Sequence, residues 1–169
     1  MDTLTAIMTR RSIRKYSPEP VTDDLVQKIL GAAMNAPSAG NQQPWHFIVV
    51  NERKTLDEIA EILPHGKMLK QAACAIVVCG DLSHEKHKGY WVQDCAAATQ
   101  NILLAAHALG LGAVWLGVYP REERMKNIGE FLKVPEGILP FCVVSMGWPG
   151  EKKEKEERYA EKRVHWNGW

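Results

Sequence analysis

The chain has 169 residues, with 21 basic and 20 acidic side chains, so its formal net charge is only +1. This length suits one domain with a substantial core, expected to span residues 1–169. A nucleic-acid-binding domain needs a broad basic footprint, which the balanced charge and a pI of 7.7 do not favour. Neither a signal peptide nor a membrane span is expected, because residues 1–11 lack a long apolar stretch and no 18 apolar residues are consecutive.

The first half of the chain shows helical and extended patterns in turn. Thr22 is a typical N-cap, two aspartates follow it, and apolar residues then recur at a spacing of four. This predicts a helix that runs to about Asn35 and ends before Pro37. The next segments predict, in order, a buried strand at 46–51, an amphipathic helix at 53–63 and a second buried strand at 74–81.

The second half begins with the longest predicted helix, at residues 90–109. It is apolar almost all round, as is typical of a helix in a core or at a subunit interface, and Gly110 is a natural C-cap. A third strand is predicted at 112–119, a helix at 120–132 with Pro120 near its start, and a fourth strand at 138–148. The expected class is mixed α and β.

The composition changes after Gly150. Residues 151–163 hold five acids and six bases, and 151–157 is expected to be a solvated tail. Val164, Trp166 and Trp169 are costly to expose to water. The extension at 150–169 is therefore expected to dock on an apolar surface, either of this chain or of another copy.

Familiar catalytic and metal motifs are missing from the sequence. The glycines of ALGLGAVWLG lie between a helix and a strand, the reverse of a dinucleotide-binding turn, and no Ser–His–Asp set is evident. HEKH at 84–87 lacks zinc-protease spacing and predicts a polar loop, while His46 and His107 are interpreted as packing residues, so no metal site is expected. Four cysteines without a CxxC pair favour buried thiols in a reducing cytosol, and these are Cys74, Cys79, Cys95 and Cys142.

The segment RRSIRKY at residues 10–16 concentrates positive charge in a nearly neutral chain. A short basic run is also typical of a solvated surface. Guanidinium groups, however, suit bidentate recognition of phosphate, and Ser12 adds a hydroxyl donor. The segment favours a site for one phosphate.

A second polar segment, NAPSAGNQQPWHF, occupies residues 35–47 between the first predicted helix and the first strand. It has the composition of an ordinary loop. Its crowded amides, with Ser38, also suit the polar edge of a flat ring. A phosphate site together with a ring site suggests a mononucleotide cofactor.

Five motifs, in this order, resemble the nitroreductase family of FMN-dependent oxidoreductases, in particular its shorter members. They are RRSIRKY, PSAGNQQPWHF, HGKMLKQA, DCAAATQNILLAAHALGLGAVWLG and the tail arginine followed by VHWNGW. The resemblance covers essentially the whole chain. It implies a three-layer α+β fold with a mixed, mostly antiparallel sheet, and an intertwined homodimer with two FMN molecules at the interface.

The resemblance also implies roles for individual residues around FMN. Arg10, Arg11 and Ser12 bind phosphate and ribityl, and Arg158 completes the phosphate site. Arg14 and Lys67 lie at the N1 and O2 edge of the ring, where reduction builds up negative charge. Leu116 and Gly117 present their backbone to N5 and O4, and the partner chain supplies Pro37, Ser38 and Asn41.

The implied activity is a ping-pong reaction in a cytoplasmic enzyme. NADH or NADPH reduces the flavin, and a nitroaromatic, quinone or similar acceptor then oxidises it, with no side chain required as acid or base. Only the short stretch between Ile62 and Ala72 is available to cover the ring. An alternative is a flavin storage or sensor protein without efficient turnover, in which Trp91 and Trp115 obstruct the ring face.

Overall fold

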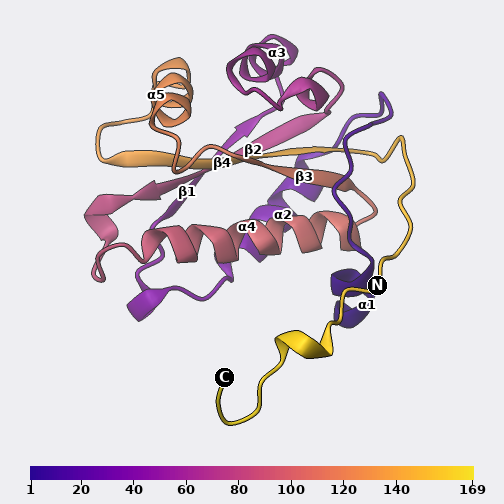
Figure 1. Ribbon diagram of the computed structural model, residues 1–169. Coiled ribbons are helices and arrows are strands. Elements are labelled where there is room, and N and C mark those ends of the chain that lie inside the picture. Colours follow the sequence, from indigo (N-terminus) through magenta and orange to yellow (C-terminus); the bar gives the residue numbers. More distant parts are fainter.

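A four-stranded antiparallel sheet forms the middle layer of the computed structural model, which describes residues 1–169 (Figure 1). Its spatial order is β1-β2-β4-β3. The central strands β2 and β4 are buried along most of their length, because helices cover both faces of the sheet. The strands are β1 (Trp45–Val50), β2 (Cys74–Asp81), β3 (Gly112–Gly117) and β4 (Ile138–Gly147).

Two pairs of helices form the outer layers. Helices α2 (Asp23–Met34) and α4 (Trp91–Ala108) pack against each other on one face, while α3 (Arg53–Ile62) and α5 (Glu122–Phe131) lie on the other (Figure 1). Alternate residues of β2 enter the two cores, Ile76 the first and Val77 the second, as the two-residue period of a strand requires. None of the helices, α4 included, combines the length and apolar character needed to cross a membrane.

The predicted helices and strands are confirmed to within a few residues, and so is the α+β class. Gly110, at φ +85°, follows the C-cap of α4 as expected. The sheet itself is entirely antiparallel rather than mixed, and the parallel pairing seen is an isolated bridge between Ser12 and Ala113. Strand β1 was expected to be buried but lies at the sheet edge, so His46 and Val49 are exposed.

The sequence patterns did not predict the short helical elements. Helix α1 (Thr3–Thr9) has only seven residues, so the helical spacing of Leu4, Ile7 and Met8 was too short a pattern to identify it. It buries only Ala6, and the Asp2 carboxylate caps it by accepting from the Thr5 amide at 3.0 Å. Four short 3₁₀ turns complete the chain: η1 (Ala39–Asn41), η2 (Lys67–Lys70), η3 (Leu82–His84) and η4 (Glu161–Arg163).

The two terminal segments run side by side (Figure 1). The Gly150 amide donates to the Lys15 carbonyl at 2.8 Å, and the Lys153 ammonium donates to the Ser12 carbonyl at 2.8 Å. The segment expected to be a solvated tail is therefore tethered to residues 11–15 through both backbone and side-chain groups, although its side chains are mostly exposed. Beyond it, the expected apolar residues do not dock on their own chain, since Trp166 is 86% exposed and Trp169 fully exposed.

Candidate functional site

The basic segment at residues 10–16 is pinned along strand β3. The Ile13 amide donates to the Ala113 carbonyl at 3.1 Å. The buried Tyr16 hydroxyl donates to the carbonyls of Ile13 at 2.9 Å and Ser145 at 3.1 Å. Burial raises the pKa of Tyr16, so the hydroxyl remains a donor at neutral pH. The fold thus fixes the backbone that carries the arginines.

The two neighbouring arginines of this segment have different surroundings. Arg11 is buried, and each of its three side-chain nitrogens donates to a carbonyl oxygen. Nη1 reaches Arg10 and Met8 at 2.7 and 3.2 Å, while Nε and Nη2 reach Glu154 and Glu156 at 3.1 and 3.4 Å. The Arg11 guanidinium therefore ties the C-terminal segment to α1.

Arg10, in contrast, is half-buried close to other positive charges. Burial first, and then the charges of Arg158 and Arg11, lower the pKa of Arg10. Arg158 donates through Nε and Nη2 to one carboxylate oxygen of Glu156, at 3.1 and 2.7 Å. Like charges held close together favour the binding of an anion between them. Ser12 is half-buried and lies two residues after Arg10. Arg10, Ser12 and Arg158 are called the Arg10 strip below.

His107 lies beside this strip at the end of α4. Its Nε2 is 2.8 Å from the Thr9 hydroxyl, which confirms it as a hydrogen-bonded residue of the fold. Burial, followed by the charges of Arg10 and Arg11, lowers the pKa of His107. The imidazole is thus neutral at pH 7 and adds no charge to the strip.

A cavity of about 630 Å³ opens between the end of β3 and the segment that follows α3. Its volume is in the range of small-molecule and cofactor sites. An added Cβ on the exposed Gly117 would meet no atom within 4 Å, so the backbone there is open to a ligand. The lining consists of Arg14, Leu63, Pro64, His65, Lys67, Met68, Val114, Trp115, Leu116, Gly117 and Arg124.

The cavity unites four residues that the family resemblance selects, namely Arg14, Lys67, Leu116 and Gly117. Two further polar groups were not predicted. Arg124 of α5 donates to the Gly117 carbonyl at 3.0 Å, and His65 lines the same wall as Lys67. His65 could have been predicted, because it stands two residues before Lys67 in the motif HGKM. Arg124 could not, because only the packing of α5 brings it to the cavity.

The polar loop at 37–43 is braced by a buried carboxylate. Asp94 of α4 accepts from the Ala39 amide at 2.9 Å and from the Gln42 side chain at 2.6 Å. Gly40, Asn41 and Gln43 all have positive φ, between 46° and 54°. Such backbone is costly for non-glycine residues and is often retained at functional sites. Asn41 is exposed and Ser38 half-exposed. The Ser38 hydroxyl and the Asn41 Oδ1 accept from Gln43 at 3.0 and 3.2 Å, which leaves the hydroxyl proton and the Asn41 NH2 group for a ligand.

This loop and the Arg10 strip lie at opposite ends of α4 (Figure 1). Asp94 holds the loop and His107 contacts Thr9 beside the strip. Their separation of 13 positions along α4 corresponds to about 20 Å of helix. The structure of one chain therefore brings Arg14, Lys67, Leu116 and Gly117 together but does not bring Pro37, Ser38 and Asn41 to the Arg10 strip.

Comparisons with known proteins give the same family as the motifs. The family model described as "Nitroreductase family" matches residues 7–66 and 63–148. A candidate NADH dehydrogenase/NAD(P)H nitroreductase of Methanothermobacter thermautotrophicus is 52% identical over the whole chain and 88% of the relative. The oxygen-insensitive NADPH nitroreductase of Salmonella typhimurium is 30% identical over 98% of this chain and 73% of the relative.

A solved structure adds a likeness in three dimensions. A candidate nitroreductase of Desulfovibrio desulfuricans, crystallised in complex with FMN, superposes with a TM-score of 0.86 at 33% identity. The match covers the whole of this chain and 98% of the other. Sequence, fold and site thus agree that the chain belongs to the nitroreductase family.

Proposed function

We infer that the protein is an FMN-dependent oxidoreductase that takes electrons from NADH or NADPH and delivers them to a nitroaromatic, quinone or similar acceptor. The observation that carries this inference is the cavity over Gly117, where Arg14, Lys67 and Arg124 gather around open backbone. The FMN complex of the Desulfovibrio relative supports the choice of cofactor. When bound, FMN supplies the hydride chemistry in both half-reactions.

The residues of this chain fit FMN at both of its ends. Arg14 and Lys67 place positive charge beside the cavity, where they would stabilise negative charge at the ring edge. Leu116 and Gly117 present backbone to the ring. Arg10, Ser12 and Arg158 are proposed to bind the phosphate, which would relieve the repulsion between the two guanidinium groups.

Arg11 is given a different part in this proposal. Its donors are already satisfied by carbonyl oxygens, including those of Glu154 and Glu156. Arg11 therefore positions the tail that carries Arg158. Arg10, and not Arg11, is proposed to bind the phosphate. No side chain is assigned as general acid or base.

We also propose a homodimer with FMN at the interface. Two observations support it: the loop with Pro37, Ser38 and Asn41 lies at the far end of α4 from Arg10, and the tail exposes Trp166 and Trp169. A second copy would supply the loop to this chain's cavity and cover the tail at 150–169. Four buried, free cysteines support a reducing cytoplasmic setting, and no nucleic-acid or membrane partner is proposed.

The storage or sensor alternative required tryptophans over the ring face. Trp91 is buried under Gly80 and packs edge-on against Tyr119, away from the cavity. Trp115 lines the cavity, but its ring packs against Phe141 in the core between the sheet and α4. Neither arrangement favours the alternative.

Stopped-flow mixing of the FMN-loaded protein with NADH or NADPH tests turnover directly. Bleaching of the flavin absorbance by at least one donor, followed by recovery when a quinone is added, is the expected result. Dithionite serves as the control that the flavin is reducible. A flavin that dithionite bleaches but neither nicotinamide reduces would contradict the enzyme and favour the storage protein.

A further inference from the structure

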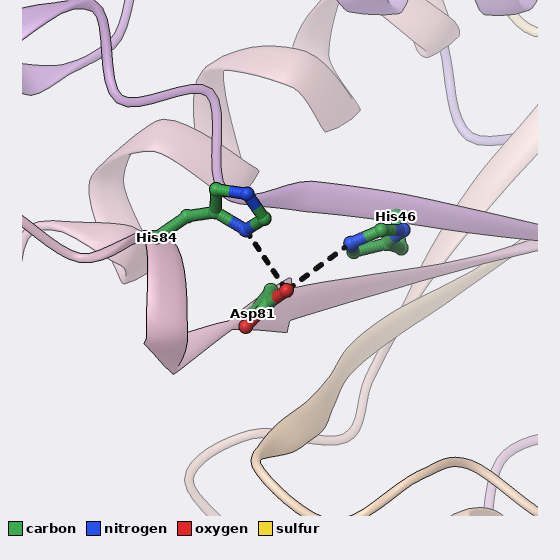
Figure 2. Close-up of side chains that lie close together, drawn as sticks. All are labelled: His46, Asp81 and His84. Carbon is green, nitrogen blue, oxygen red and sulfur yellow. Dashed lines mark hydrogen bonds and ion pairs between the residues drawn. The ribbon is translucent and has the colours of Figure 1, made fainter.

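A cluster of three potential metal ligands lies outside the proposed flavin cavity. Figure 2 shows His46 of β1 and His84 of η3 pointing toward one carboxylate, that of Asp81 at the end of β2. None of the three lines the cavity over Gly117. His46 is not the packing residue expected from the sequence, since it is more than half exposed, whereas His84 begins the polar loop expected at 84–87. Both histidines contact Asp81.

The sheet register explains why these residues meet. Trp45 pairs with Gly80, and the Asp81 amide donates to the Pro44 carbonyl at 2.7 Å, so Asp81 and His46 are diagonal neighbours across the two strands. Diagonal neighbours on one face of an antiparallel pair are within reach of long side chains. The η3 turn then brings His84, three residues after Asp81, back over the carboxylate.

The distances are close to those of a metal site. Asp81 Oδ2 is 2.9 Å from His84 Nδ1 and 3.4 Å from His46 Nε2, and all ligand atoms lie within 4.8 Å of one another. Ligands at 2.0–2.1 Å from a tetrahedral ion are about 3.3 Å apart. Only the separation of the two imidazoles has to shrink, and both side chains are more than half exposed and free to rotate.

The carboxylate is prepared for this role by its other contacts. Asp81 Oδ1 accepts from the Ser83 amide at 2.8 Å and the Ser83 hydroxyl at 2.7 Å, which leaves Oδ2 to face the histidines. These bonds, with a further contribution from His84, lower the pKa of Asp81 to about 2. A fixed, ionised ligand supported by an outer hydrogen bond is typical of metal sites in proteins.

We propose that His46, Asp81 and His84 bind Zn²⁺ or a similar transition-metal dication. Two imidazoles and one carboxylate suit zinc, cobalt, nickel or copper, whereas magnesium and calcium prefer oxygen ligands. Three protein ligands leave a coordination position for water. The ion joins the edge strand β1, the end of β2 and the turn before Lys86 and His87, whose amides hold Gln42 at 2.8 and 3.1 Å.

Calorimetric titration of Zn²⁺ into the FMN-loaded protein, after removal of metal with a chelator, is the test. One ion per chain is expected, and zinc at a hundredfold excess over its Kd raises the Tm by roughly 5 to 10 °C. His84→Gln and Asp81→Asn each weaken binding by at least about 10- to 100-fold, and Ser83→Ala by about tenfold through the outer hydrogen bond. The surface position of His84 makes its variant the one safest for folding.

His165→Gln is the matched control, since it removes a histidine that stacks on Trp169 in the tail, and it leaves zinc affinity unchanged. Co²⁺ gives a visible spectrum without a thiolate charge-transfer band, because no cysteine belongs to the cluster. Absence of saturable zinc binding would overturn the proposal. So would equal affinity in the wild type and His84→Gln, or a thiolate band with cobalt.

Discussion

The two ends of helix α4 carry the two halves of the proposed FMN site, and these halves differ in charge. At the end near His107, Arg10 and Arg158 hold like charges together, and Glu156 is the only acid that pairs with Arg158. At the other end, the Asp94 carboxylate of α4 accepts from Gln42 and braces the strained loop. The first half carries excess positive charge, whereas the second is held by internal hydrogen bonds. This contrast supports the proposal that FMN joins the two halves.

Removal of the brace at the loop end is expected to have the largest effect. Asp94→Asn keeps one oxygen, which can accept from Ala39 or Gln42, and replaces the other by an NH2 group. Gln42 cannot turn its side chain, because its Oε1 already accepts from the amides of Lys86 and His87. The new NH2 group and the donor that it faces are then both unsatisfied, which should cost about 2 to 4 kcal/mol of unfolding free energy. Urea unfolding at a fixed protein concentration measures this loss.

Asp24→Asn on α2 is the matched control for this variant. Asp24 is a mostly exposed acid that pairs with Lys28 on the same helix, so its loss should change stability by no more than about 0.5 kcal/mol. Similar losses in the two variants would show that the buried brace adds nothing specific.

A substitution at the Arg10 end of α4 is expected to change the affinity for FMN rather than the stability of the fold. Arg10→Ala should weaken FMN binding by roughly 10- to 150-fold, since a charge-assisted bond contributes about 1.5 to 3 kcal/mol. Riboflavin, which lacks the phosphate, should bind to the variant as it does to the wild type. Fluorescence titration with both flavins makes the measurement, and equal losses for the two would refute the phosphate site.

A mixed dimer tests whether the two ends meet across an interface. An Arg10→Ala chain and a Ser38→Ala/Asn41→Ala chain, refolded together, form mixed dimers in which one site collects both lesions and the other none. With random pairing, half of the dimers are mixed, so about a quarter of all sites should regain tight FMN binding. Mass spectrometry counts the mixed dimers. If they form and no tight site appears, each loop serves its own chain.

The sequence was sufficient to predict the helices and strands but not the groups that their side chains contact. The long apolar run of α4 and the N-cap pattern at Thr22 predicted helices that the structure confirms, although the Thr22 side chain makes no capping hydrogen bond. The strand order depends on contacts between distant segments, so the edge position of β1 was missed. Likewise, a guanidinium is visible in the sequence as a charge, but only the fold shows that Arg11 is bound by carbonyls while Arg10 is not.

The candidate site was likewise predicted only in part. Arg14, Lys67, Leu116 and Gly117 were predicted from motifs, and the fold places them around one cavity. Arg124 has no motif, because its place depends on how α5 packs against β4 and α3. The brace from Asp94 was also missed, since a carboxylate in an apolar helix gives no sign of which loop it will hold.

The smallest expected effect concerns Glu156, the acid that pairs with Arg158. In the free protein Glu156 occupies the donors that a phosphate would need, and the Arg158 bond is the main cause of its lowered pKa. Glu156→Gln should release Arg158 and tighten FMN binding by only about two- to fivefold, because exposed ion pairs contribute little. The gain should shrink at high salt, which screens the pair in the wild type. Glu154→Gln is the control, since Arg11 contacts the carbonyl of Glu154 and not its side chain. Weaker FMN binding in Glu156→Gln than in this control would mean that Glu156 orients Arg158 toward the phosphate instead of competing with it.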